Sequence, residues 1–117
     1  MFHQFCKAKI SKGLVTKTEL NYDGSLGVDS GILELANIYP YEMVLVINLT
    51  NGNRFETYVI PEKSGSGTIG VYGGAARLCK VDDELIVLAF AYLDKNEIQS
   101  FKEPKVIKLA KGNKLQS

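Results

Sequence analysis

The stretch that most constrains the fold is "MVLVINLTNGNRFETYVI", residues 43–60. Its first part, Met43–Leu49, is continuously apolar and rich in β-branched residues, and its last part, Arg54–Ile60, alternates polar with apolar residues. Both patterns are typical of β-strands. Asn51-Gly52 lies between them and favours a type I′ turn, because both central positions of that turn need a positive φ. The stretch therefore predicts a β-hairpin.

Strand-type patterns also recur along the rest of the chain, mostly bounded by Gly, Pro or Asp. The expected strands are Phe2–Ile10, Val15–Leu20, Ser25–Val28, Thr68–Tyr72, Leu85–Leu93 and Pro104–Leu109. Many short strands in a chain of 117 residues predict one all-β domain, built as a closed barrel or a sandwich.

Three short segments between the strands have helical patterns. Asp29 or Ser30 can cap a helix that ends before Pro40, and Ala75–Leu78 and Asp94–Phe101 are the other two segments. The polar tail from Ala110 is expected to fray.

The distribution of charged and apolar residues argues against nucleic-acid and membrane partners. Fourteen basic residues stand against thirteen acidic ones, and the basic residues are scattered from Lys7 to Lys114 without forming a block. The longest apolar run, Leu85–Leu93, is much shorter than the roughly 20 residues that a membrane helix needs. Met1–Ile10 lacks the apolar stretch of a signal peptide. We therefore expect a cytoplasmic protein with no nucleic-acid or membrane partner.

The usual catalytic and ligand-binding motifs are missing. Cys6, Cys79 and the single histidine, His3, form no metal-binding spacing, and no His-based nucleophile pattern is present. The glycines of "GSGTIG" (residues 65–70) match a dinucleotide-binding pattern, but they precede a strand and not a helix, so a glycine-rich turn is expected. No metal site is predicted.

The second strand of the hairpin carries side chains that suit a substrate site. Arg54 and Tyr58 are four residues apart and share one face, about 13 Å apart, whereas Thr57 points to the other face. A guanidinium suits a carboxylate and a phenol can donate a proton. Taken alone, this strand favours an ordinary solvent-facing surface, and Gly24-Ser25 in "NYDGSLGVD" favours an ordinary turn.

Four segments in this order resemble bacterial aspartate 1-decarboxylase, a pyruvoyl-dependent enzyme family. They are "LNYDGSLGVD" (20–29), "TNGNRFETYVI" (50–60), "GGAA" (73–76) and "VDDELIVLAFA" (81–91). The resemblance covers nearly the whole chain and implies a double-psi β-barrel with a few short helices, assembled as a homotetramer.

The resemblance also implies chemistry at Gly24-Ser25. The Ser25 hydroxyl attacks the Gly24 carbonyl, and elimination and hydrolysis leave a covalent pyruvoyl group derived from Ser25. The chain is thereby divided into residues 1–24 and 25–117. Gly24 has no Cβ, so the hydroxyl can approach its carbonyl closely. Thr57 is expected to polarise that carbonyl and later to contact substrate.

The implied reaction removes the α-carboxylate of L-aspartate and yields β-alanine, a precursor of pantothenate. The pyruvoyl ketone forms a Schiff base with the substrate amine and withdraws electrons from the breaking bond. By the same resemblance, Tyr58 returns a proton and Arg54 and Lys9 hold carboxylates. The backbone of Gly73, Gly74 and Ala75 lines the pocket.

Two positions beside the expected site depart from the family. Ser11 stands where a histidine is usual, and Tyr72 stands where an asparagine amide could stabilise the oxyanion of self-cleavage. A phenol is a poor substitute for that amide, so self-cleavage is expected to be slow, incomplete or dependent on a maturation factor. Two alternatives stay open: an unprocessed structural or regulatory relative, and a barrel that binds a small anion without turnover.

Overall fold

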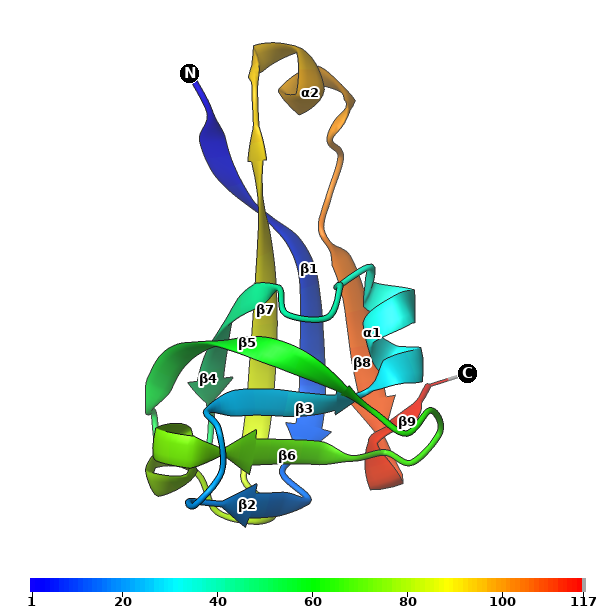
Figure 1. The fold of residues 1–117 in the computed structure, drawn as a ribbon. Helices are drawn as coiled ribbons and strands as arrows, with labels where there is room; N and C mark the ends of the chain where they lie inside the picture. Colours follow the sequence, from blue (N-terminus) through cyan, green and yellow to red (C-terminus); the bar gives the residue numbers. More distant parts are fainter. Residues whose placement is uncertain (117) are drawn as a thin grey trace.

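A computed structural model describes residues 1–116 as one continuous chain (Figure 1). Its strands are β1 (His3–Leu14), β2 (Lys17–Glu19), β3 (Ser25–Asp29), β4 (Met43–Asn48), β5 (Arg54–Glu62), β6 (Ile69–Tyr72), β7 (Glu84–Leu93), β8 (Lys105–Ala110) and β9 (Lys114–Leu115). The α-helices are α1 (Ser30–Ala36) and α2 (Lys95–Ser100), and the 3₁₀ helices are η1 (Gly73–Leu78) and η2 (Lys111–Asn113). The predicted all-β class, with a few short helices, is confirmed.

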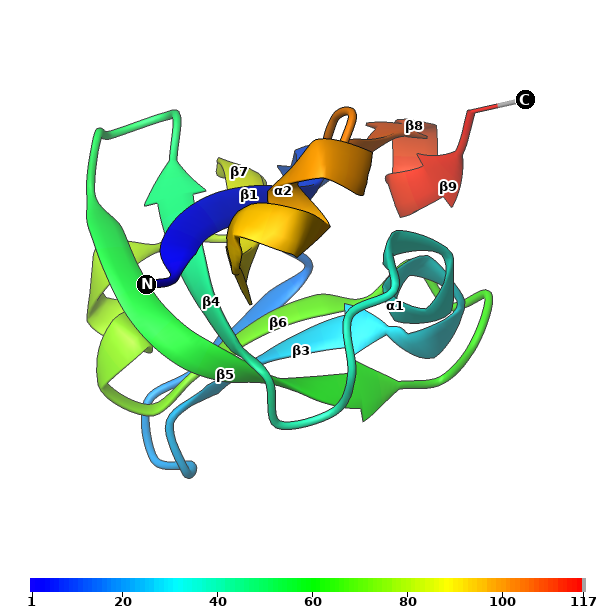
Figure 2. The ribbon, with the colours of Figure 1, turned by 90° about the horizontal axis from the view of Figure 1, so that it is seen from above.

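The strands form one mixed sheet in the order β2-β6-β3-β5-β4-β7-β1-β8-β9. The sheet curls, so that β3, β5 and β6 cross over β1, β7 and β8, as Figures 1 and 2 show. Pairing is parallel for β1 with β8, β2 with β6 and β3 with β5. This arrangement is consistent with the expected double-psi barrel, although within residues 1–116 the terminal strands β2 and β9 are not paired into a closed ring.

A single apolar core lies between the crossing strands. Leu26, Val28 and Val71 come from the β3–β6 side, and Ile10 and Val87 come from the β1–β7 side. These side chains are almost completely buried because alternate residues of each strand point inward.

The predicted hairpin is confirmed, but its turn is not the expected one. β4 and β5 are joined by residues 49–53, and Gly52 has φ +82° whereas Asn51 is not in the positive-φ region. The Asn51 side chain instead accepts from the Asn53 N–H and donates to the Leu78 carbonyl. The type I′ interpretation was therefore wrong, because side-chain hydrogen bonds stabilise a longer loop.

The predicted helices are present, and the C-terminal tail differs from the expectation. Asp29 caps α1, and Asp94 forms a capping box with Glu97 at α2. The tail was expected to fray, but η2 and β9 follow β8, and buried Asn113 hydrogen-bonds the backbone of Leu14 and Gly67. Those side-chain bonds fix the tail to the barrel.

A long arm projects from the barrel, formed by the distal parts of β1 and β7 with α2 at its tip (Figure 1). Phe5 and Phe101 pack together there with ring centroids 5.2 Å apart. Phe2 and Tyr92 remain exposed on this arm. Within residues 1–116, no helix is long and apolar enough to cross a membrane.

Buried Asp29 joins three parts of the chain at the end of β3. Its carboxylate accepts hydrogen bonds from the backbone N–H groups of Gly31, Gly65 and Gly67, at 2.8, 3.1 and 2.9 Å. Burial alone would raise the pKa of Asp29, but the backbone hydrogen bonds outweigh it and lower the pKa below its usual value. The charged carboxylate therefore holds the 65–67 turn against α1.

We predict that Asp29→Asn lowers the free energy of unfolding at pH 7 by about 1–2 kcal/mol, because the charged acceptor is lost. Since the folded-state pKa of Asp29 is depressed, its contribution exists above the unfolded-state value and disappears as the pH falls through the folded-state value. Urea unfolding between pH 7 and pH 2 should show that the free energy of unfolding falls less steeply with pH for the variant than for the natural chain. If the free energy of unfolding of Asp29→Asn falls with pH as steeply as that of the exposed control variant Glu103→Gln, this role of Asp29 is contradicted.

Candidate active site

The Gly24-Ser25 bond lies where the chain enters the barrel. Gly24 is exposed, whereas Ser25 is the first residue of β3 and is only 2% exposed. The Ser25 Oγ donates to the Asp23 carbonyl at 3.4 Å. The hydroxyl is thus held on the N-terminal side of its own residue, near the carbonyl that a self-cleavage reaction would attack.

Gly73 presses against this bond from the end of β6. It has φ +72°, and a Cβ added there would lie 2.6 Å from the Gly24 Cα and 2.9 Å from the Tyr22 carbonyl oxygen. Only glycine fits both the conformation and the space. Of the other two predicted lining residues, Gly74 is exposed and Ala75 packs against the core.

The β3–β5 pairing places two other predicted residues beside the bond. Leu26 is in register with Val59, and continuing this parallel register by two residues puts Thr57 level with Gly24. In the same way, Tyr58 is level with Ser25 and on the same face of the sheet. The Tyr58 ring lies 6.0 Å from that of Tyr41, whose N–H donates to the Val59 carbonyl.

The two predicted carboxylate-binding residues lie at other positions in the sheet. Arg54 is exposed at the start of β5, about 13 Å along the strand from Tyr58. Lys9 lies on β1, which is separated from β3 by β5, β4 and β7 in the sheet. Ser11 is also on β1, where it pairs with Lys108 of β8.

The residues around Ser25 do not line the hollow that lies over the neighbouring strands. A hollow of about 460 Å³ lies over β4, β5 and β7, where its lining includes Met43, Glu56 and Tyr92. That lining does not include Ser25, Arg54 or Gly73. A complete substrate pocket is therefore not formed at this hollow.

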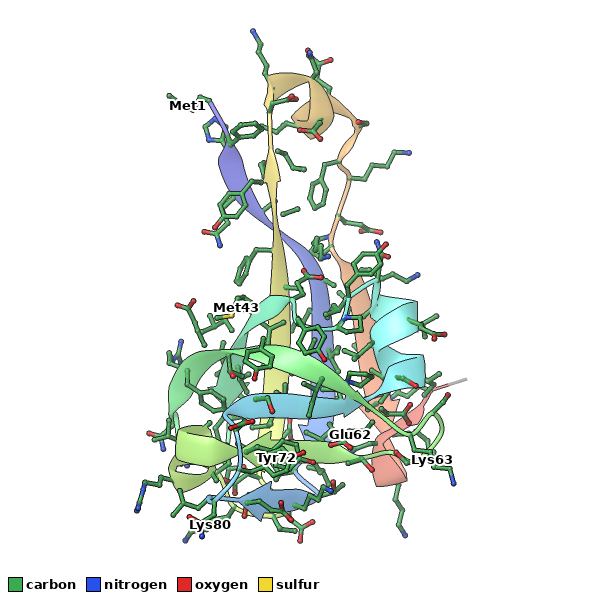
Figure 3. All side chains as sticks on the ribbon, in the orientation of Figure 1. Met1, Met43, Glu62, Lys63, Tyr72 and Lys80 are labelled. Atoms are coloured by element: carbon green, nitrogen blue, oxygen red, sulfur yellow. The ribbon has the colours of Figure 1, made fainter. Side chains whose placement is uncertain are left out.

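Tyr72 lies along the outer face of β6 and not over the Gly24-Ser25 bond. Tyr72 is 3% exposed and its hydroxyl donates to Glu62 Oε2. Figure 3 labels both residues. Burial and then the hydrogen bond to Glu62 raise the pKa of Tyr72. The phenol is therefore a protonated donor to Glu62, and its expected effect on self-cleavage stays a prediction.

Sequence reasoning missed two residues of this neighbourhood. The Tyr22 ring packs on the Tyr72 ring with centroids 5.0 Å apart, and Glu62 accepts from the Tyr72 hydroxyl. Tyr22 was visible within the segment that carries the family resemblance. No pattern in the sequence indicates that Glu62, ten residues from Tyr72, faces the same ring.

Comparison with known proteins identifies the family. The sequence profile of the aspartate decarboxylase family matches residues 1–116. An aspartate 1-decarboxylase from Thermoanaerobacter pseudethanolicus is 47% identical over 108 residues, which cover 92% of this chain and 92% of that relative. Another from Ralstonia pickettii is 40% identical over 117 residues, 100% of this chain and 97% of the relative.

A third relative, the aspartate 1-decarboxylase of Leptospira biflexa, is 41% identical over 109 residues, 93% of this chain and 92% of its own length. The chain therefore belongs to the aspartate decarboxylase family, and the resemblance drawn from the four sequence segments is confirmed.

We predict that Gly73→Ala strongly impairs self-cleavage, because the methyl group would displace Gly24 and φ +72° is unfavourable for alanine. The variant should also unfold at a lower temperature. Intact-mass spectrometry and thermal unfolding measure the two effects. Gly74→Ala is the matched control, since a Cβ at Gly74 meets nothing within 4 Å. Equal cleavage by both variants would show that close contact at Gly73 is unimportant.

Proposed function

We propose that this chain is a self-processing, pyruvoyl-dependent aspartate 1-decarboxylase. It converts L-aspartate into β-alanine and carbon dioxide, and thereby supplies pantothenate synthesis in the cytoplasm. The observation that carries the proposal is the family match over residues 1–116 together with a Gly24-Ser25 bond enclosed by Gly73 at the start of β3.

Self-cleavage uses the chain's own atoms. The Ser25 Oγ forms a bond to the Gly24 carbonyl carbon while the Gly24–Ser25 C–N bond breaks, which gives an ester and a free amine. Elimination then releases the Gly24 carboxylate, and water replaces the nitrogen as ammonia leaves. Thr57 polarises the Gly24 carbonyl during the first step, in keeping with its level beside Gly24 in the β3–β5 register.

The residues around position 25 fit a pyruvoyl group. Residue 25 is buried at the first position of a strand that is paired on both sides, so a blocked terminus there would stay fixed in place. Its carbonyl, when present, supplies an electron sink for decarboxylation. Tyr58, on the same face as residue 25, returns a proton to the substrate carbon.

Substrate recognition requires the two cations that stand apart within one chain. An Arg54 guanidinium can bind a carboxylate by two parallel hydrogen bonds, and Lys9 adds a second positive charge. Backbone groups of Gly73, Gly74 and Ala75 complete the pocket. Arg54 lies about 13 Å along β5 from Tyr58, and Lys9 lies on β1, which is not a neighbour of β3 in the sheet. We therefore propose that a homotetramer brings these two residues to the site from neighbouring subunits. The exposed Phe2 and Tyr92 of the arm suit such an assembly.

The two products of cleavage should remain one folded domain. Residues 1–24 contain β1, which pairs with β7 on one side and β8 on the other, and β2, which pairs with β6. The buried side chains of Ala8 and Ile10 also hold this piece in the core. Separation would therefore require unfolding.

We predict that purified protein contains pieces of residues 1–24 and 25–117, the second blocked at its front by pyruvoyl. Intact-mass spectrometry before and after warming measures how far cleavage proceeds, and slow conversion that a maturation factor accelerates would agree with Tyr72 in place of an asparagine. Borohydride with aspartate should trap an adduct at position 25.

Ser25→Ala is the control for self-cleavage: it should fold and form the same assembly, yet never divide. A free serine terminus at position 25 would contradict the mechanism. A natural chain that stays whole under all conditions would favour the unprocessed alternative.

We predict that Arg54→Lys lowers kcat/KM for aspartate about a hundredfold while self-cleavage is unchanged, because the charge is kept and the two-pronged hydrogen bonding is lost. Arg77→Lys, on the exposed side of η1, is the matched control. Steady-state kinetics on fully cleaved protein measure the effect. Unchanged kinetics for Arg54→Lys would remove Arg54 from the site.

A further inference from the structure

The Tyr72 side chain lies in a groove on the outer face of β3 and β6. We call this groove, formed by Gly27, Gly70 and Glu62, the seat of Tyr72. A Cβ at Gly70 would overlap its phenol ring, and a Cβ at Gly27 would lie 2.9 Å from the ring and would overlap the Glu62 carboxylate. Gly27 and Gly70 are cross-strand partners, so the two glycines together leave one continuous groove. Gly27 and Gly70 therefore leave space for the Tyr72 ring, and Glu62 binds its hydroxyl.

The seat places the hydroxyl away from the cleavage point. Ser25 is paired with Tyr72 and Gly27 with Gly70, so the hydroxyl over Gly70 lies two residue pairs, about 7 Å, along the sheet from Ser25. Glu62 on β5 accepts a hydrogen bond from this hydroxyl. The Tyr72 hydroxyl is thus held by its hydrogen bond to Glu62 and is not directed at the Gly24 carbonyl.

The anchored ring contacts both segments that enclose Gly24. On the N-terminal side, the Tyr22 ring packs on the Tyr72 ring at 5.0 Å, and Tyr22 is two residues before Gly24. On the other side, Tyr72 is followed directly by Gly73, where an added Cβ would lie 2.6 Å from the Gly24 Cα and 2.9 Å from the Tyr22 carbonyl oxygen. Lys17 of β2 adds a cation 5.5 Å from the centre of the Tyr72 ring.

We propose that Tyr72 is a positioning residue for self-cleavage, which acts through Tyr22 and Gly73, and that Glu62 holds Tyr72 in the required place. The proposal rests on the self-cleavage proposed above and adds two residues to it. Without the anchor, the ring can turn in its groove, Tyr22 loses its support, and Gly24 is less often aligned with the Ser25 hydroxyl. Small misalignments of reacting groups reduce rates strongly.

The test compares self-cleavage rates of purified precursors by intact-mass spectrometry. Glu62→Leu and Tyr72→Phe each remove the hydrogen bond and should slow cleavage about tenfold or more. Glu62→Gln keeps an acceptor oxygen and should stay within about twofold of the natural chain. Ile107→Val on β8 serves as a control that lowers stability without touching the seat.

A double-mutant cycle tests whether Tyr72 acts through Tyr22. Tyr22→Leu should slow cleavage by itself, and Tyr22→Leu combined with Glu62→Leu should be no slower than the slower single variant. If the combined variant is slowed by the product of the two single-variant effects, the claim that Tyr22 and Glu62 act together is overturned. Glu62→Leu at the natural rate, or slowed no more than Ile107→Val at equal loss of stability, would overturn the positioning role.

These outcomes also separate this proposal from the one on which it rests. A natural chain that cleaves while its Glu62 and Tyr72 variants cleave equally fast contradicts only the positioning role. A natural chain that never cleaves, alone or with a maturation factor, contradicts both.

Discussion

The two-sided pairing of β3 is the constraint on which the site depends. β3 runs parallel to β5 and antiparallel to β6, and all five of its residues are buried. Ser25 is the first residue of the strand and pairs with Tyr72, and Gly73 lies against Gly24. The β3–β5 register, continued past Leu26, brings Thr57 and Tyr58 level with Gly24 and Ser25. A strand paired on one side only would leave the end that carries Ser25 free to move.

Much of the fold was predictable because strands leave local patterns. The hairpin of residues 43–60, the helix capped by Asp29 and the strand beginning at Ser25 all follow from periodicity or capping residues. The type I′ turn and the frayed tail were wrong for one shared reason. In each case asparagine side chains, Asn51 and Asn113, hydrogen-bond backbone groups far along the chain.

The candidate site was predictable only in part. The family resemblance predicts Gly24, Ser25, Thr57, Tyr58 and Gly73 as site residues. The β3–β5 register, continued past Leu26, and the tight space at Gly73 agree with this prediction. The seat of Tyr72 could not be found in this way, because it depends on a cross-strand pair of glycines and on the position of Glu62. Such matches between distant positions appear only once the strands are paired.

Because Arg54 and Lys9 lie at other positions in the sheet than Ser25, we propose that assembly into a homotetramer completes the substrate site. In the homotetramer proposed above, one chain supplies the cleaved bond and the proton donor, while a neighbouring chain supplies the cations that recognise carboxylates. The exposed aromatic residues of the arm offer apolar surface for such contacts. Under that proposal, self-cleavage needs only residues of one chain, whereas turnover needs the complete assembly.

Positional labelling of the substrate tests the central claim most directly. Fully cleaved protein is incubated with L-aspartate labelled at carbon 1 or, separately, at carbon 4, and the released carbon dioxide and the amino-acid product are measured. The account predicts label in carbon dioxide only from carbon 1, with β-alanine as the product. Release from carbon 4 with formation of alanine, or binding of aspartate without any release, would contradict it.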